Sequence, residues 1–140
     1  MFEKILLAVD GSEHGVRAAR TAGDLSRAMK SQRIRIVVAY EPIPPYLGEP
    51  NLQQAIDARL IQAKAILEAA VKAVGETPAE IHTELIEGSP AEAIISVAVT
   101  RSSDVIVMGS RGLGRIAGAV LGSTSQKVVT HAPCPVLIIR

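Results

Sequence analysis

Aromatic residues are almost absent from this chain of 140 residues. Two tyrosines, one phenylalanine and no tryptophan make up 2% of it. Proteins that hold single-stranded nucleic acid stack its bases on aromatic side chains, so this composition argues against that function. The formal net charge is only +1. That value also argues against a protein whose whole surface binds nucleic acid or membrane.

Cysteine is scarce as well, since Cys134 is the single one. It cannot form an internal disulfide, which is typical of proteins in reducing compartments. The chain has no apolar run long enough to span a membrane and does not open like a signal peptide, so we expect a cytoplasmic protein without membrane insertion. With 48% hydrophobic residues, we expect one domain over residues 1–140 with a core of its own.

Acidic residues are missing from the last part of the chain. Residues 101–140 hold five of the fifteen lysines and arginines but one of the fourteen acidic residues. A local excess of positive charge is what an anion site needs. Chance can produce the same pattern over a short stretch, so charge alone does not establish an anion site.

Short apolar runs alternate with segments of helical period. Strands are predicted over 4–9, 34–40, 80–86, 105–108 and 136–139, and helices over 13–30, 51–75, 90–100 and 123–132. The expected helix N-caps are Ser12, Asn51, Ser89 and Ser123. This alternation predicts an α/β fold, an open five-stranded parallel sheet with helices on both faces. Right-handed crossovers leave few topologies, and we predict the Rossmann-like strand order 3-2-1-4-5.

The most informative segment lies between the fourth strand and the last helix. Residues 109–122 contain five glycines, two arginines and no acidic residue. Glycine lets a backbone approach a ligand closely, and the free N–H groups of the following helix N-terminus attract anions. The segment therefore indicates a phosphate site, with a flexible glycine-rich turn as the alternative. Ser123 can donate to a phosphate or cap the helix, but it cannot do both equally well.

The common phosphate-binding motifs do not fit this segment. A Walker motif needs a lysine before Ser123, and none is there. A dinucleotide fingerprint belongs in the first strand-to-helix turn, where residues 10–12 are Asp-Gly-Ser. Gly112 and Gly114 do not complete a Gly-x-Gly-x-x-Gly pattern, because Ala117 occupies its last position.

The same glycines resemble another family, the universal stress proteins, and in particular their ATP-binding branch. Its signature is Gly, two residues, Gly, nine residues, then Gly-Ser or Gly-Thr. Here Gly109, Gly112 and Gly122-Ser123 have that spacing. The resemblance covers the whole chain, since segments 5–12, 88–90 and 132–136 are also similar to the family's strand and helix flanks.

The resemblance implies a site for an adenine nucleotide, ATP or AMP, with Mg²⁺ held, where it takes part, through the phosphates. It implies that Asp10 meets the ribose or the adenine edge and that the backbone of Ala39 hydrogen-bonds adenine. The other implied contacts are Val9 and Met108 in the base pocket, Gly109 and Gly112 near the ribose and phosphates, and Gly122, Ser123 and Thr124 at the phosphates. The family often has His-Val where this chain has Val38-Ala39, which keeps backbone contacts but changes side-chain shape.

Several of these residues have simpler interpretations. Asp10 can merely form the turn, while a role as a phosphoacceptor would need further acidic and lysine partners that the sequence lacks. The three histidines, at positions 14, 82 and 131, have no metal-ligand spacing, so we expect them to be solvated or at helix ends. The proline-rich segment 42–50 is either a lid over the ligand or a stiff connection.

The sequence favours a nucleotide-binding protein with a regulatory, stress-response role. It offers no Gly-x-Ser-x-Gly elbow and no evident general base beside the phosphates. A slow ATPase or phosphoryl-transfer enzyme is the alternative, and a scaffold whose nucleotide is only structural is a third class. The last strand, Val136–Ile139, has no charge or proline inside it. It therefore predicts a homodimer through this edge, alongside an unidentified regulatory protein partner.

Overall fold

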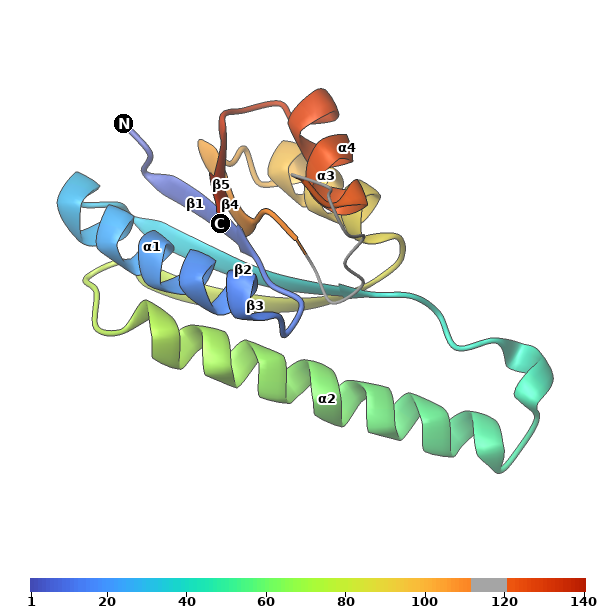
Figure 1. The fold of residues 1–140 in the computed structure, drawn as a ribbon. Helices are drawn as coiled ribbons and strands as arrows, with labels where there is room; N and C mark the ends of the chain where they lie inside the picture. The colour runs from blue at the N-terminus through green and yellow to red at the C-terminus, as the bar shows by residue number, and fades with distance from the viewer. Residues whose placement is uncertain (112–120) are drawn as a thin grey trace.

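One parallel sheet organises the molecule. The computed structural model of the protein describes residues 1–111 and 121–140. Its five strands lie in the order β3-β2-β1-β4-β5 and pair in parallel throughout (Figure 1). This confirms the predicted α/β fold and strand order.

The element boundaries also follow the sequence pattern. The strands are β1 (Lys4–Ala8), β2 (Arg33–Tyr40), β3 (Glu80–Glu87), β4 (Val105–Gly109) and β5 (Val136–Ile139). The helices are α1 (Glu13–Met29), α2 (Asn51–Val74), α3 (Pro90–Thr100) and α4 (Ser123–His131), with a 3₁₀ turn, η1 (Pro45–Leu47). Strand and helix ends differ from the predicted ones by one residue at most. The prolines of segment 42–50 predict no regular structure there. This is wrong for η1, because proline fits the first position of a helical turn.

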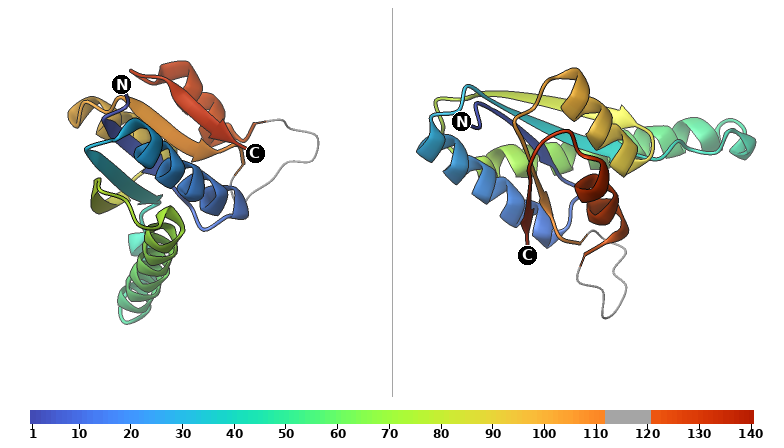
Figure 2. Two further views of the ribbon diagram at one scale, coloured as in Figure 1. Left: turned by 90° about the vertical axis from the view of Figure 1, so that its left-hand side faces the viewer. Right: turned by 90° about the horizontal axis from the view of Figure 1, so that it is seen from above.

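Helices cover both faces of the sheet, as predicted. Helices α1 and α2 pack on one face, and α3 and α4 pack on the other (Figure 2). Successive side chains of a strand point to opposite faces. Ile5 and Leu7 of β1 therefore enter the first core, between the sheet and helices α1 and α2. Leu6 enters the second core, between the sheet and helices α3 and α4. Burial on both faces explains why β1 and β4 are continuous apolar runs. No helix in the described part of the chain is long and apolar enough to cross a membrane.

The helix starts depart from the expected caps at three places. Ser12 caps α1 as predicted, its Oγ accepting from Gly15 N–H at 3.2 Å. Asn51 and Ser123 are wrong as N-caps, because each is already the first helical residue, and Pro50 and Gly122 precede them. Ser89 occupies the N-cap of α3, but its side chain makes no capping bond. A cap needs extended backbone at its own position, which a residue inside the first turn lacks.

The buried face of α1 is made of small residues. The sequence predicts a face of Val16, Ala19, Ala22, Leu25 and Met29. The two alanines are buried as predicted, whereas the three large side chains are only partly buried. The residues that α1 buries most deeply are Ala18, Ala19, Ala22, Gly23 and Ser26. The interpretation of the period was thus partly wrong, because it favoured large side chains where the helix lies close to its neighbours.

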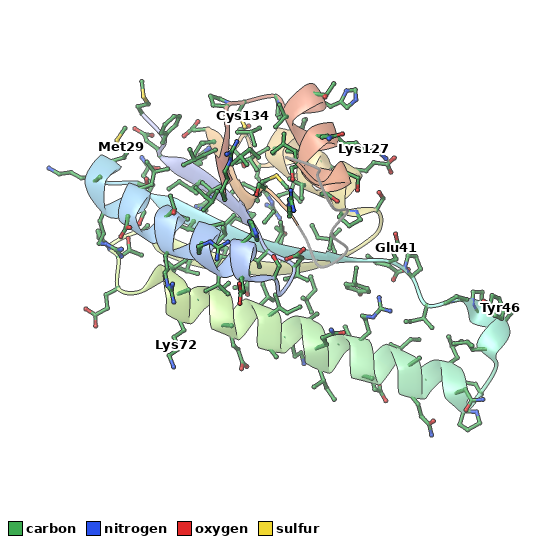
Figure 3. The ribbon with its side chains drawn as sticks, in the orientation of Figure 1. Met29, Glu41, Tyr46, Lys72, Lys127 and Cys134 are labelled. Carbon is green, nitrogen blue, oxygen red and sulfur yellow. The ribbon has the colours of Figure 1, made fainter. Side chains whose placement is uncertain are left out.

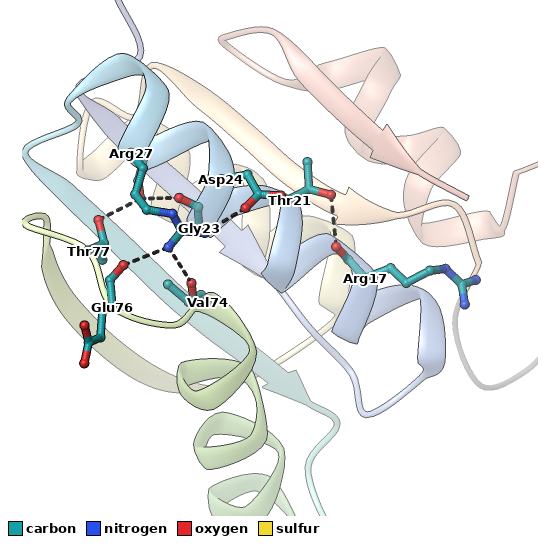
Figure 4. Close-up of polar contacts among 9 residues, drawn as sticks. Arg17, Thr21, Gly23, Asp24, Arg27, Val74, Glu76 and Thr77 are labelled. Atoms are coloured by element: carbon teal, nitrogen blue, oxygen red, sulfur yellow. Dashed lines mark hydrogen bonds and ion pairs between the residues drawn. The ribbon is translucent and has the colours of Figure 1, made fainter.

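The reason for the small residues is the contact between α1 and the end of α2. A Cβ atom at Gly23 would collide with the backbone carbonyl of Val74. Arg27 reinforces this contact, since its Nη1 donates to the carbonyls of Val74 at 3.0 Å and Glu76 at 2.8 Å (Figure 4).

Only the second half of α2 is buried. Its buried residues are Ala63, Leu67, Ala70 and Val74, whereas the first half runs past the sheet with η1 at its far end (Figures 1 and 3). Tyr46, at that far end, is 85% exposed. The segment 42–50 is therefore part of a projecting arm.

We expect Gly23→Ala to lower the free energy of unfolding by about 1–3 kcal/mol, because the added methyl group overpacks against backbone. Gly15→Ala is the matched control on the same helix. Its Cβ would find nothing closer than 3.5 Å, and alanine's helix propensity should leave stability unchanged or raise it by up to about 1 kcal/mol. Urea denaturation measures both. Equal midpoints for the two variants would contradict the close contact with Val74.

Candidate functional site

A cleft opens at the carboxyl ends of the strands, where β1 lies between β2 and β4. Strand order reverses at this point, which is where open α/β sheets bind ligands. The cleft measures about 110 Å³ and adjoins a wider hollow of about 350 Å³ that shares Asp10, Ala39 and Pro90 with it. Together they have the size of a small-molecule site.

Most of the predicted site residues meet in this cleft. Six of them line it: Val9, Asp10, Ala39, Met108, Gly109 and Thr124. Gly122 and Ser123 do not line it, but they directly precede Thr124 at the start of α4. Gly112 lies outside the described residues. No residue of 42–50 lines the cleft, so this structure gives the lid interpretation no support.

Asp10 forms the turn between β1 and α1. Its Oδ1 accepts from the N–H of Ser12 at 2.9 Å, and Ser12 Oγ in turn caps α1. The turn-forming interpretation therefore describes what this carboxylate does within the protein. It also lines the cleft, where a carboxylate can accept hydrogen bonds from hydroxyl groups.

Gly109 has a packing role that the sequence did not indicate. A Cβ at this position would lie 2.6 Å from Cβ and 2.9 Å from the carbonyl carbon of His14. Only glycine lets the first turn of α1 approach the end of β4 this closely. The glycine is thus required by the fold, whatever ligand the cleft takes.

His14 lies at a helix end, one of the two expected settings, but it is not solvated. It is 9% exposed, and its Nδ1 lies 3.1 Å from Ser110 Oγ. Its position in the first turn of α1 places it against β4, where Gly109 leaves room. His131, by contrast, is exposed at the last position of α4, as predicted. His82 is half-exposed, and its Nε2 lies 3.8 Å from Glu80 Oε2 on β3.

Ser110 joins three elements around the cleft. Its N–H donates to Ile139 O at 2.7 Å, and its carbonyl accepts from Gly122 N–H at 2.7 Å and from Ser125 Oγ at 2.8 Å. These bonds hold β5 and the start of α4 against the end of β4. Both serines are buried.

Eight further residues line the cleft that were not predicted from the sequence. They are Ala8, Ser12, Gly15, Val37, Pro90, Ile94, Arg111 and Ser125. Two of them carried a usable signal. Arg111 belongs to the basic segment without acids, and Ser125 lies within the expected cap of α4, where a hydroxyl can bond to backbone.

The electrostatic potential of the cleft favours anions. Among the described residues that line it, Arg111 is basic and Asp10 is acidic. The N-terminus of α4 adds partial positive charge, because Thr124 lies in its first turn. In residues 1–111 and 121–140, no group of three His, Cys, Asp or Glu side chains is placed to hold a metal ion.

Cys134 takes no part in the cleft. It packs against the second core. Burial raises the pKa of its thiol, and the negative charge of Asp104 raises it further. The thiol therefore stays protonated at neutral pH and is a poor nucleophile.

The whole chain, residues 1–140, matches the model of the universal stress protein family. The chain belongs to this family. It is 48% identical over 140 residues to a universal stress protein of Thermus aquaticus, with both chains fully covered. The solved structure of universal stress protein UspA from Lactobacillus plantarum is similar, with a TM-score of 0.87 and 28% identity over 99% of this chain and 98% of that one. A universal stress protein solved in complex with cAMP has a TM-score of 0.69 and 27% identity, over 99% of this chain and 97% of that one.

We expect Ser125→Ala to lower the free energy of unfolding by about 1 kcal/mol, because the buried carbonyl of Ser110 loses a hydrogen bond. Ser123→Ala is the matched control at the start of the same helix. Ser123 is exposed and makes no cap, so its loss should change stability by less than about 0.5 kcal/mol. Thermal and urea unfolding compare the two. A larger loss for Ser123→Ala would contradict the assigned helix start.

Proposed function

We propose that this protein binds an adenine nucleotide in the cleft between β1 and β4. The observation that carries the proposal is the convergence there of an apolar wall, the Asp10 carboxylate and the N-terminus of α4. The family relative in complex with cAMP, itself an adenine nucleotide, supports the same ligand class. We assign the protein a regulatory role in the stress response, in the cytoplasm and with a protein partner still to be identified.

The backbone of Ala39 suits recognition of the adenine edge. In a parallel strand, successive residues direct their N–H and C=O groups alternately to the two neighbouring strands. Val37 O accepts from Val9 N–H on the β1 side, and Tyr40 O accepts from Gly88 N–H on the β3 side. The N–H and C=O groups of Ala39 therefore point to the β1 side of the strand. They lie beyond Val37, the last residue of β2 that pairs with β1. No residue in the described part of the chain bonds to the N–H or C=O of Ala39 on that side, so both are available to a ligand.

Apolar side chains next to this edge provide a surface for a flat base. Val37, Ile94 and Met108 line the cleft with Ala39, and they come from β2, α3 and β4. A base that enters here would leave water for apolar surface, which is favourable. Asp10, at the end of β1, would then accept from a ribose hydroxyl.

The start of α4 suits the phosphates. Its first intrahelical bond runs from Gln126 N–H to Gly122 O at 3.0 Å, so the N–H groups of Ser123, Thr124 and Ser125 have no intrahelical partner. Such groups bind phosphate at helix N-termini, and Arg111 adds a full positive charge. Because the cleft offers one carboxylate, Mg²⁺ would be held mainly by ATP phosphates.

We expect ATP, AMP or cAMP to bind at least about tenfold more tightly than the corresponding guanine nucleotides. Guanine presents O6 and N1–H where adenine presents N6–H₂ and N1, so its donors and acceptors oppose those of Ala39, and a mispaired polar group costs about 1–3 kcal/mol. Titration calorimetry with each nucleotide measures this preference. The absence of heat and of a thermal shift with every adenine nucleotide would refute the proposal.

Variants at the start of α4 test where the phosphates lie. Gly122 has φ −71° and ψ 166°, which any residue adopts, so Gly122→Val should fold and act only by blocking the phosphate approach. We expect it to abolish binding and Ser123→Ala to weaken it by about 1–2 kcal/mol, roughly tenfold. Thr130→Ala, exposed near the other end of α4, is the control. Parent-like affinity in both site variants would place the phosphates elsewhere.

We also propose a homodimer through β5. This strand is an edge of the sheet and carries no charge to discourage pairing. The opposite edge, β3, carries Glu80, His82 and Glu84, which discourage it. Leu137 is 38% exposed, and antiparallel pairing with a second β5 would cover it and close the assembly.

Leu137→Lys should shift the protein toward the monomer, because it places a charge in the proposed seam. Leu137 is preferable to Ile138, whose side chain packs against the second core, so that a charge there would also disturb folding. Val99→Lys, on α3 and 60% exposed, is the control. Sedimentation velocity at micromolar concentration decides: a monomeric parent, or a dimer that Leu137→Lys leaves intact, contradicts this interface.

A further inference from the structure

We propose that a second hollow, beside the cleft, binds a phosphate group through His14, Arg111 and Arg140. It lies between the first turn of α1, the residues that follow β4 and the end of β5, and it measures about 270 Å³. Since a water molecule takes about 30 Å³ in the liquid, a tetrahedral anion fits with room for solvent. Ser110 completes the lining.

The buried ring of His14 is the first observation. The residue is nine-tenths buried yet lines the hollow. Its Nδ1 lies 3.1 Å from the hydroxyl of Ser110, which is 2% exposed. If the hydroxyl donates to Nδ1, the neutral ring carries its proton on Nε2. No described residue bonds to Nε2, so this nitrogen is a donor for whatever occupies the hollow.

The charge of the hollow is the second observation. Arg111 and Arg140 line it, and no acidic side chain does so among the described residues. The main-chain oxygen of Arg140 accepts from Arg17 Nε at 2.9 Å. The first turn of α1 adds partial positive charge, because the helix ladder starts only at Val16 N–H, which donates to Ser12 O at 3.2 Å. The nearest acids along the chain are engaged elsewhere: Asp10 accepts from Ser12 N–H, and Glu13 lies 4.0 Å from Arg17.

The chemistry points to phosphate in particular. Guanidinium groups pair with phosphate oxygens through two parallel hydrogen bonds, and a neutral imidazole N–H can serve a third oxygen. Arg111 lines both the cleft and the hollow, so the two sites adjoin. The phosphate could thus be the terminal group of a nucleotide in the cleft, which rests on the proposed function, or free orthophosphate, which does not.

Two variants separate the contributions of His14 and Arg111 to phosphate binding. His14→Asn keeps an amide near the position of Nδ1, within reach of Ser110, and removes Nε2. Arg111→Gln removes a charge from a side chain that is only partly buried, so the fold is preserved. Arg20→Gln, exposed on α1 and outside the hollow, is the control. Sodium phosphate is titrated at low ionic strength and followed by ³¹P NMR and calorimetry, with sodium chloride as the reference salt.

We expect the parent and Arg20→Gln to bind inorganic phosphate equally. His14→Asn and Arg111→Gln should each bind it about tenfold more weakly or worse, as for a charge-assisted hydrogen bond. If ATP displaces the phosphate and AMP does not, the hollow takes the terminal phosphate, and His14→Asn then weakens ATP but not AMP. If neither nucleotide displaces it, the hollow is a site for free phosphate.

No phosphate binding by the parent, or equal binding by all four proteins, would overturn the inference. AMP binding, measured on the same preparations, distinguishes failure of the phosphate site from failure of the nucleotide cleft. A protein that binds AMP but shows neither phosphate binding nor an effect of His14→Asn retains the nucleotide cleft and loses only the second site. A protein that binds phosphate but no nucleotide retains the second site and loses the nucleotide cleft.

Discussion

The hydrogen bonds of Ser110 hold the site together. This one residue connects the end of β4 to the edge strand β5 through its N–H, and to the start of α4 through its carbonyl. Its hydroxyl reaches His14 of α1. The start of α4, the edge strand β5 and the first turn of α1 are therefore all joined to the end of β4, beside the cleft. Segments from opposite ends of the chain meet at this one buried residue.

A second requirement is close packing by residues without large side chains. Helix α1 meets β4 at Gly109 and α2 at Gly23, where even one methyl group would strike backbone. Alanine and glycine bury little apolar area, so the large aliphatic residues of the strands supply most of the core. This division explains a chain rich in hydrophobic residues and poor in aromatic ones: the layers lie too close for large rings between α1 and the sheet.

The sequence predicted the strands, the helices and the strand order, because buried parallel strands and amphipathic helices leave strong periodic patterns. It also predicted that Asp10, Ala39 and the glycine-rich segment meet at one cleft, since parallel strands end at one edge. Met108 and Thr124 were expected there only from the family resemblance. The positions that it missed depend on partners far along the chain. The burial of His14 follows from Ser110, 96 residues away, and no local pattern encodes that contact. The caps of α2 and α4 were misplaced by one residue, because asparagine and serine are acceptable both at an N-cap and just inside it.

The two halves of α2 should differ in local stability. Residues from Ala63 onward are anchored in the core, whereas the first half makes few buried contacts. A free helix of about a dozen residues is marginal in water because its first turn is costly to form. The anchored half supplies that turn, and the projecting half needs only to extend it. The order of the projecting half therefore depends on the anchored half. Fraying should proceed from Asn51 inward and stop where the side chains reach the sheet, so that the arm can loosen while the cleft at the strand ends stays formed.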